Sequence, residues 1–525
     1  MTVSIDIIPF SNSLDMFGEP DRSAAYSISG HIVISMTSGF SIFQPRHALR
    51  LLLRSLVITF EGQSELFVPD SAYSAVRLYS VSQELVSADS IELNAEDCDN
   101  LDKPCTWNVV FNLTVPGWLP PTCLFGDFDN SGETGTRYGL YAAAKFENVD
   151  DSPRSSWFSA FCNPFNFYTV RSVKAPRCPI QLNRYTSPSY FASTSTSLFP
   201  LSNFSVRAEP DDHEHSDKSP RIPAHILSAL RVVCSVPDYI GTGEERFPFS
   251  LRMRTSGLSA DECARLRVAQ FDIELEQTER YRYIHSTQPS SSYCTQYPVP
   301  PRSEQPPHRP LLNPHPVHTL FDLGVGPSPP SQHVLARSFS LLPEDVSGRY
   351  SLSGDGYVFA QDAQPHDNVT WFSMSSSVPV SHHDIRGGND WKNGRSLRAT
   401  QQSPLFGVAH RFLVSVDCTY DLTDGEEPER ASERLHFHVP LYFVRTPPAT
   451  SSGSRATTPL GFNSPSSSGR SSPCDYPIPS LPYAQALPAY SQLFESNGDR
   501  KIDYSTPLPL YTPKDTNAPN EENPI

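Results

Sequence analysis

Apolar and polar residues alternate along much of the first 450 residues, which is typical of β-strands with one buried face. Residues 107–115 show this most plainly, because every second residue from Trp107 to Val115 is apolar. Residues 56–61 alternate as well, with Phe60 on the apolar face and Glu61 on the polar one. Each of these segments is therefore predicted to be a strand at the surface of a hydrophobic core.

The predicted strands fall into two groups separated by a polar stretch. The first group comprises residues 26–34, 56–61, 107–115, 137–146 and 165–170. The second group comprises residues 230–234, 247–253, 268–275, 370–374, 412–420 and 435–444. Two groups of short strands with few helical patterns predict an all-β protein made of two consecutive antiparallel β-sandwich lobes of the immunoglobulin type.

Changes in composition set the boundaries of these lobes. We expect an N-terminal lobe at 1–177, a polar and turn-rich inter-lobe connection at 178–221 and a C-terminal lobe at 222–446. A stretch rich in Pro, Ser and His, at about 286–332, is predicted to be a disordered insertion in the second lobe. From 447 to 525 Ser, Pro and Thr dominate, and we expect a disordered tail.

Charge and cysteine content narrow the classes of partner. The chain has 525 residues and a formal net charge of −16, which argues against nucleic acid as its main partner. No basic stretch followed by an apolar core opens the sequence, so no signal peptide is expected. The ten cysteines are scattered, and we expect reduced thiols in a cytoplasmic protein.

The tail repeats one short pattern, Leu-Pro-x-Tyr. The two copies consist of Leu487, Pro488 and Tyr490, and of Leu508, Pro509 and Tyr511. Proline fixes φ near the polyproline II value, and the following tyrosine offers a ring and a hydroxyl to an aromatic-lined groove. These features are those of ligands for WW domains. The duplication makes chance a weaker explanation.

Residue patterns of catalysis or metal binding are sparse. There is no G-x-S-x-G and no Walker-type loop, and Gly354 and Gly356 are interpreted as turn residues. His436 and His438 are expected on the wet face of a strand. Solvated histidines, rather than metal ligands, are also expected at His213, His215, His315, His318, His382 and His383. The sequence therefore predicts a protein that is not an enzyme and has no cofactor or metal, although it leaves open a triad built from distant residues.

Two further sets of residues bear on binding and regulation. Arg46, Arg50 and Arg54 would suit phospholipid head groups or phosphorylated cargo, but positions on or near a strand are the simpler interpretation. A weak contact with phospholipid stays among the expected partners. Candidate sites of proline-directed phosphorylation are Thr458, Ser464, Ser472, Thr506 and Thr512.

The order of these strands, together with the tail, resembles the arrestin-domain adaptors, the α-arrestins of fungi and animals. The similar segments are residues 26–34 (YSISGHIVI), 56–62 (LVITFEG), 111–121 (FNLTVPGWLPP), 138–142 (YGLYA) and 439–444 (VPLYFV). The tail departs from the family pattern because it has Leu-Pro-x-Tyr in place of Pro-Pro-x-Tyr. No buried charge network like that of the visual arrestins can be located in the sequence, so phosphate-triggered activation is not implied.

The resemblance implies a cytoplasmic adaptor that is recruited peripherally to plasma membrane and endosomes. Such a protein would link a membrane transporter or receptor to a WW-domain ubiquitin ligase of the HECT type and promote ubiquitination and endocytosis. Its own candidate ubiquitin acceptors are Lys145, Lys174, Lys218, Lys501 and Lys514, with Lys218 the first choice. The alternatives are a signalling scaffold of the same fold, as in ambient-pH sensing, and an unrelated β-sandwich enzyme or binding module.

Overall fold

The computed structural model describes sixteen stretches of the chain up to residue 448. They are residues 2–37, 50–68, 72–87, 90–94, 105–125, 134–148, 171–188, 198–206, 209–210, 220–283, 297–322, 334–352, 354–360, 371–382, 396–422 and 429–448. Residues 1–449 form one unit, and the second unit, 450–525, lies outside the described residues. Strands dominate and helices are few, so the prediction of an all-β protein is confirmed.

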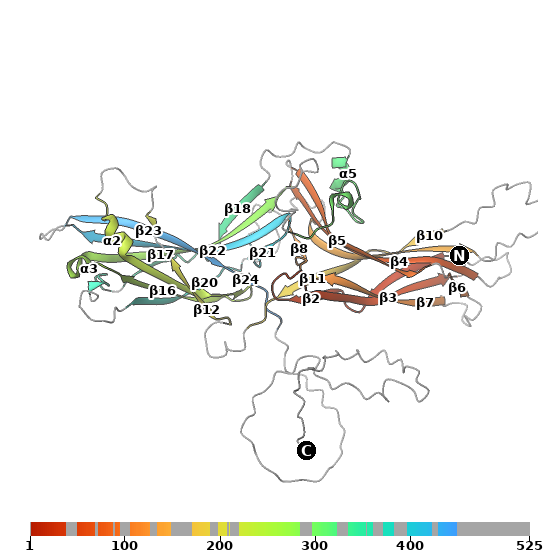
Figure 1. Ribbon diagram of the computed structural model, residues 1–525, viewed down its shortest axis with the longest axis horizontal. Coiled ribbons are helices and arrows are strands. Elements are labelled where there is room, and N and C mark those ends of the chain that lie inside the picture. The colour runs from red at the N-terminus through yellow and green to blue at the C-terminus, as the bar shows by residue number, and fades with distance from the viewer. Residues whose placement is uncertain are drawn as a thin grey trace, which may run out of the picture. The chain divides into compact units, whose positions relative to one another are not determined.

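The N-lobe, defined here as the described residues from 2 to 188, has two sheets (Figure 1). The smaller has the order β1-β3-β7, with β1 Thr2–Pro9, β3 Ala25–Thr37 and β7 Cys105–Pro116. The larger has the order β2-β11-β9-β4-β5, with β2 Ser13–Phe17, β11 Cys178–Tyr185, β9 Gly135–Asn148, β4 Arg50–Val68 and β5 Ala72–Val86. β6 (Ile91–Asn94), β8 (Cys123–Leu124) and β10 (Arg171–Lys174) join it at its margins.

The C-lobe, defined as the described residues 198–283 and 334–448, again has two main sheets. One has the order β12-β14-β16-β20, with β12 Leu201–Val206, β14 Leu230–Pro237, β16 Arg246–Thr255 and β20 Phe372–Pro379. The other has the order β13-β23-β22-β17-β18, with β13 Glu209–Pro210, β23 Arg430–Leu441, β22 Phe406–Asp421, β17 Leu266–Arg282 and β18 Val334–Ser340. β19 (Arg349–Ser351) and β21 (Gln401–Gln402) join the second sheet, and β15 (Ile240–Gly241) pairs with β24 (Phe443–Val444).

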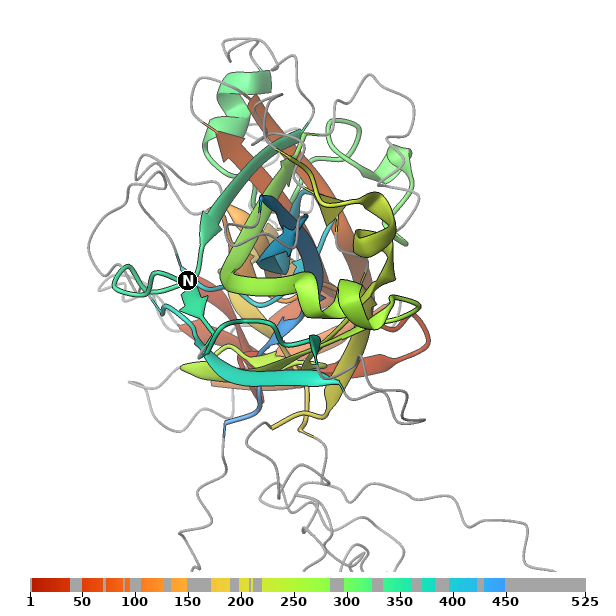
Figure 2. The same cartoon turned by 90° about the vertical axis from the view of Figure 1, so that its left-hand side faces the viewer.

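Alternation along the strands produces the packing of these sheets. In β7 the residues from Trp107 to Val115 that share one face are buried or half-buried, and the residues between them are exposed, as predicted. Phe60 is fully buried and its ring stacks on that of Tyr138, with 5.8 Å between centroids. Each lobe buries apolar side chains from both of its main sheets in a shared core. Figure 2, which has the C-lobe nearest the viewer, shows its sheets as facing layers.

The short helices are α2 (Ala224–Ala229), α3 (Ala260–Arg265), the 3-10 helix η2 (Arg302–Glu304) and α5 (Val317–Asp322). α3 begins at a capping box, in which the Ser259 hydroxyl accepts from the Glu262 backbone N–H and the Glu262 carboxylate accepts from that of Ser259. No helix in the described stretches has both the length and the apolar character needed to cross a membrane.

The predicted inter-lobe connection at 178–221 is wrong for most of its described residues. β11 pairs with β9 and, in parallel, with β2 of the N-lobe, so residues 178–185 complete an N-lobe sheet. β12 pairs with β14 over residues 201–206 and belongs to the C-lobe. These strands are short and hold many polar residues, which is why composition alone suggested a linker.

The predicted disordered insertion also needs correction. Residues 297–322, which we call the strap, include η2 and α5 and make hydrogen bonds to the N-lobe. α5 lies beside β5 (Figure 1). The remainder of the predicted insertion, 286–296 and 323–332, lies outside the described residues. Abundant proline indicated disorder, but proline-rich chain is also ordered where a partner supplies hydrogen bonds to its carbonyls.

The cysteines differ in part from the expectation of reduced thiols. Cys105, at the start of β7, is in a disulfide bond, whereas five other described cysteines are free. Burial raises the pKa of the free thiols Cys234 and Cys418 to about 12, so neither is a ready nucleophile at neutral pH.

Candidate functional site

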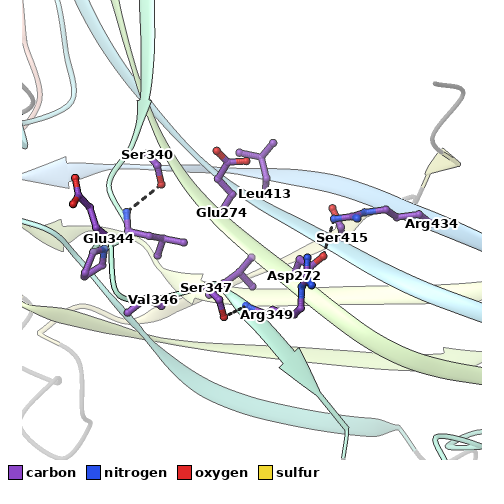
Figure 3. Close-up of a pocket in the computed structure, with 13 residues that line it drawn as sticks. Asp272, Glu274, Ser340, Glu344, Val346, Ser347, Arg349, Leu413, Ser415 and Arg434 are labelled. Carbon is purple, nitrogen blue, oxygen red and sulfur yellow. Dashed lines mark hydrogen bonds and ion pairs between the residues drawn. The ribbon is translucent and has the colours of Figure 1, made fainter. Parts of the chain in front are cut away.

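An open groove of about 750 Å³ lies on the outer side of the larger C-lobe sheet (Figure 3). β17 contributes Asp272 and Glu274, β22 contributes Ser415, and the loop before β19 contributes Glu344. Asp272 forms ion pairs with Arg434 at 2.7 Å and Arg349 at 3.3 Å. Arg434 also lies 3.9 Å from Asp417, so two carboxylates balance the two guanidinium groups, and the exposed Glu274 and Glu344 leave the groove weakly acidic.

A second cavity, of about 720 Å³, lies where the two lobes meet. Trp118 and Arg184 line it from the N-lobe, and Tyr239, Tyr442 and Arg398 from the C-lobe. Beside it, Arg398 Nη1 donates to the Leu124 carbonyl at 3.0 Å. The rings of Phe125 and Phe406 stack with 4.4 Å between centroids. The lobes therefore share an apolar contact with a polar rim.

Charged residues are buried at the heart of the C-lobe side of this junction. Glu279 on β17 is inaccessible and forms ion pairs with Arg337 at 2.7 Å and Arg398 at 3.0 Å. Its carboxylate also accepts from the Tyr281 hydroxyl at 2.6 Å. Gln277, two residues earlier, donates to Glu279 at 3.0 Å and to the Ser396 carbonyl at 3.1 Å. We call Gln277, Glu279, Tyr281, Arg337 and Arg398 the C-lobe charge cluster.

A similar group lies in the N-lobe, at the end of β4. Glu61 pairs with Arg77 of β5 at 2.8 Å, and both side chains are inaccessible to solvent. Glu65 pairs with Arg137 of β9 and accepts from the Tyr73 hydroxyl. Gln63 donates to Glu65 at 2.7 Å and to the Asn313 carbonyl of the strap at 2.8 Å. Glu61, Gln63, Glu65, Arg77 and Arg137 form the N-lobe charge cluster.

The two clusters share one design. In each lobe a Gln-x-Glu sequence on a long strand places both side chains in a buried site, as Gln63 and Glu65 and as Gln277 and Glu279. In each, an arginine and a tyrosine hydroxyl satisfy the carboxylate, and the glutamine amide holds the backbone of a distant segment. No buried charge network was predicted from the sequence, and the structure corrects this. A buried charge needs such partners.

The outer face of the smaller C-lobe sheet carries a single sign of charge. β12, β14, β16 and β20 contain four arginines and no aspartate or glutamate. Arg231 of β14 lies directly opposite Arg254 of β16, and like charges in register destabilise a sheet. The Arg254 guanidinium lies 4.5 Å from the Trp371 ring centroid. Among the described residues, Arg231 and Arg254 have no carboxylate partner, so this arginine face can accept an anion.

Histidines were predicted to be solvated, and the structure confirms this at some positions. His436 and His438 are exposed on β23 while Phe437 and Val439 between and after them are buried. His382 is exposed as well. His315, which belongs to the strap, is instead buried against the N-lobe, and its backbone N–H donates to Glu65 at 2.7 Å. His213, His215 and His383 lie outside the described residues, and within the described ranges no three candidate ligands gather as a metal site would require.

Most of the predicted binding residues fall where the structure gives no description. Both Leu-Pro-x-Tyr motifs and all five candidate phosphorylation sites lie in 450–525. Among the candidate ubiquitin acceptors, Lys145 on β9 and Lys174 on β10 are exposed, and Lys218, Lys501 and Lys514 lie outside the described residues. Arg54 is exposed and its guanidinium pairs with Glu147 at 2.5 Å, which favours its interpretation as an ordinary strand residue. Arg46 lies outside the described stretches and so does the side chain of Arg50.

The arginine face and the charge clusters were not predicted. The sequence does contain a signal for the arginine face, since four strands without an acidic residue are unusual in a chain of net charge −16. No family model matches this chain, and no curated protein matches it either.

Proposed function

We propose that the protein is an adaptor that joins a membrane transporter or receptor to a WW-domain ubiquitin ligase and itself performs no chemistry. The lobes, arranged as in the arrestin-domain family that the sequence resembles, bind the cargo, and the tail binds the ligase. Tethering raises the concentration of the ligase near the cargo and thereby promotes ubiquitination and endocytosis.

The arginine face is the observation that carries this proposal. Arg252 and Arg254 project from one face of β16, next to a row of serine hydroxyls on β20 that begins with Ser373. Guanidinium groups and hydroxyls together suit carboxylates, which accept several hydrogen bonds. The cargo feature that fits is an acidic, extended segment on the cytosolic side of a membrane protein.

The tail supplies the second half of the proposal. Tyr490 and Tyr511 are 21 positions apart, a span of roughly 25 Å on average for a flexible chain. Tandem WW domains can therefore engage both motifs at once, and the second contact sees an effective concentration of about millimolar. Each motif alone binds weakly, because a four-residue ligand buries little surface.

The experiment titrates the full chain with a purified protein that carries two WW domains in tandem. Tyr490→Ala and Tyr511→Ala should each lower affinity, and the double variant should lose more than either, by about a hundredfold in all. Tyr504→Ala, a tail tyrosine outside both motifs, is the matched control. Equal binding of the double variant and the unaltered chain would show that these motifs do not recruit the ligase.

A further inference from the structure

The strap contacts a different lobe from the two strands that flank it in the sequence. It connects β17 to β18, which are adjacent antiparallel strands of the C-lobe. Such strands need only a short turn between them. The strap nevertheless makes its hydrogen bonds with the N-lobe strands β4, β5 and β9. The chain thus leaves the C-lobe, binds the N-lobe and returns.

Arg77 is the centre of the site that holds the strap. Its guanidinium donates to three strap carbonyls, those of Glu304, of Arg309 at 3.2 Å and of Pro310 at 2.5 Å. Its Nε remains paired with Glu61. All these acceptors on the strap are backbone atoms, so Arg77 recognises the course of the strap's main chain rather than its side chains.

The carboxylates of the N-lobe charge cluster complete this recognition from the other side. Glu61 accepts from the backbone N–H of Leu312, and Glu65 from that of His315, both at 2.7 Å. Between them, the Asn313 carbonyl accepts from Gln63 and, at 3.0 Å, from Arg137. Between Leu312 and His315 the main chain of the strap therefore presents a donor, an acceptor and a second donor, and each has a partner in the cluster.

Gln305 of the strap acts as a substitute for a neighbouring strand. Its side-chain amide accepts from the Arg77 backbone N–H at 2.8 Å and donates to the Arg77 carbonyl at 2.9 Å. β5 is the last strand of its sheet, so these groups face the sheet edge. One side chain thus satisfies both backbone groups of a residue at an open edge.

Polar contacts carry much of this attachment. Leu311 and His315 are the buried side chains of the strap, Tyr297 and Val299 pack half-buried against the hydrophobic core that includes the N-lobe side chains, and Leu312 and Leu320 are 48% and 52% exposed. Water can replace hydrogen bonds to carbonyls and carboxylates but cannot replace apolar packing. The polar contacts of the strap can therefore be exchanged for water when the strap detaches.

We propose that the N-lobe charge cluster is a receptor site for the main chain of a proline-rich segment, and that the strap is its resident ligand and a detachable brace between the lobes. While it is bound, the strap restrains the lobes in addition to the contact of Phe125 with Phe406. Its release frees the lobes to move and opens the site. This inference is independent of the proposed adaptor function.

The test measures backbone hydrogen exchange by mass spectrometry in the full chain carrying Gln305→Leu. At nearly constant size, this change removes the two side-chain hydrogen bonds to Arg77 and a third to the Pro300 carbonyl. Exchange should rise about fivefold or more in residues 297–322 and in β5. It should rise also in residues 123–125 and 396–406, where the lobes meet. Ser303→Ala, a neighbouring exposed change, should leave all these rates unaltered.

Three outcomes overturn the proposal. Faster exchange of the strap with unaltered exchange at 123–125 and 396–406 would show that the strap covers the N-lobe without bracing the lobes. Unaltered exchange in Gln305→Leu, and also in Leu312→Pro, which removes the N–H donated to Glu61, would show that these contacts do not hold the strap. Leu312→Ala is the control for the second variant, and circular dichroism verifies that each folds.

The third outcome concerns the receptor site. A synthetic peptide of residues 297–322, in excess, should slow the exchange of β5 again in the Gln305→Leu protein. The same peptide carrying Gln305→Leu should not do so. If neither peptide slows exchange, the cluster is not a receptor for this main chain.

Discussion

Glu279 illustrates how a single carboxylate determines the arrangement of residues far apart in the sequence. It is inaccessible, and two guanidinium groups from different segments, Arg337 and Arg398, neutralise it. Arg398 in turn donates to the Leu124 carbonyl of the N-lobe. A buried charge that loses its partner costs far more than an exposed one, because it stays desolvated. Substitutions here therefore affect both lobes.

Glu279→Gln should lower the free energy of unfolding by about 3–5 kcal/mol, because it leaves Arg337 and Arg398 without their carboxylate. Chemical denaturation of the purified chain measures this. Glu274→Gln, an exposed change on the same strand, should alter stability by less than about 0.5 kcal/mol. Similar denaturation midpoints for the two variants would contradict the importance given to the cluster.

His410, which contacts Gln277 of the C-lobe charge cluster, makes the stability of the fold depend on pH. Its ring nitrogens lie 2.9 Å from the Thr400 hydroxyl and 3.0 Å from the Gln277 side-chain oxygen. Burial lowers the pKa of His410 to about 3. The unfolded chain, in which a histidine titrates near 6.5, therefore binds this proton first as the pH falls.

Stability should accordingly decrease as the pH falls below about 6.5, and His410 should contribute up to about 1.4 kcal/mol per pH unit down to about pH 3. His410→Asn keeps a polar side chain but removes the titration, so its stability should depend less on pH across that window. Urea denaturation at several pH values provides the comparison. Parallel pH profiles for the two proteins would refute the assignment.

At the scale of the elements, the most distinctive surface is the arginine face, which belongs to a four-stranded sheet whose charged residues are all arginines of β14 and β16. Arg231 and Arg254 oppose each other in register, and Arg252 donates to Asn203 at 3.2 Å. The matching sheet of the N-lobe, β1-β3-β7, carries no comparable set of arginines in its strands. An acidic segment bound to the arginine face would relieve the repulsion between Arg231 and Arg254.

Poly-glutamate should bind the protein at low ionic strength, and the double change Arg252→Gln with Arg254→Gln should weaken binding at least about fivefold, or by about 1 kcal/mol. Arg171→Gln with Arg280→Gln removes the same charge from exposed positions on β10 and β17 and serves as the control. Fluorescence anisotropy with a labelled peptide measures the affinities. Equal loss in both double variants would indicate a general charge effect and no specific face.

At the scale of the whole molecule, the proposed adaptor would be held beside the ligase that it recruits. Lysines are few, and Lys145 and Lys174 project from β9 and β10, which pair over the four residues of β10. Both are exposed, and Lys218 stays the first choice among the acceptors. Ligase-dependent modification of the chain itself follows from this proximity.

Mass spectrometry of the protein from cells should therefore find ubiquitin remnants on Lys218, Lys145 or Lys174. Lys218→Arg should lower total modification by about half or more, given proximity as the main determinant. Tyr490→Ala with Tyr511→Ala, which leaves every lysine intact, should remove the signal. Persistent modification in that double variant would mean that another route brings the ligase.

The strands could be predicted because their signal is local. Each face of β7 and β23 follows from alternation within a dozen residues. Glu61 shows the limit of this method, since it was assigned to the polar face of β4 and is only 1% exposed. The register shifts between Gly62 and Gln63, and the strap covers the site. Neither the register shift nor the contact with the strap can be predicted from the residues around Glu61.

The predictions for the strap and for the connection between the lobes were wrong for a related reason. Proline content and polarity describe what a segment would do alone, whereas the strap is ordered by Arg77 and Glu61, more than 200 positions earlier. Likewise, residues 178–185 are a strand because β9 and β2 offer an open edge. Composition carries no information on such long-range pairing.

The N-lobe charge cluster and the strap are far apart in the sequence, so the cluster is synthesised well before the strap. Glu65 leaves the ribosome 250 positions before His315, its later hydrogen-bond donor. At roughly 5–20 residues per second, the nascent N-lobe waits on the order of 10–50 s for the segment that satisfies its buried charges. Throughout that interval the edge of β5 is open to other chains, so we expect the nascent N-lobe to be most prone to aggregation before the strap has been made.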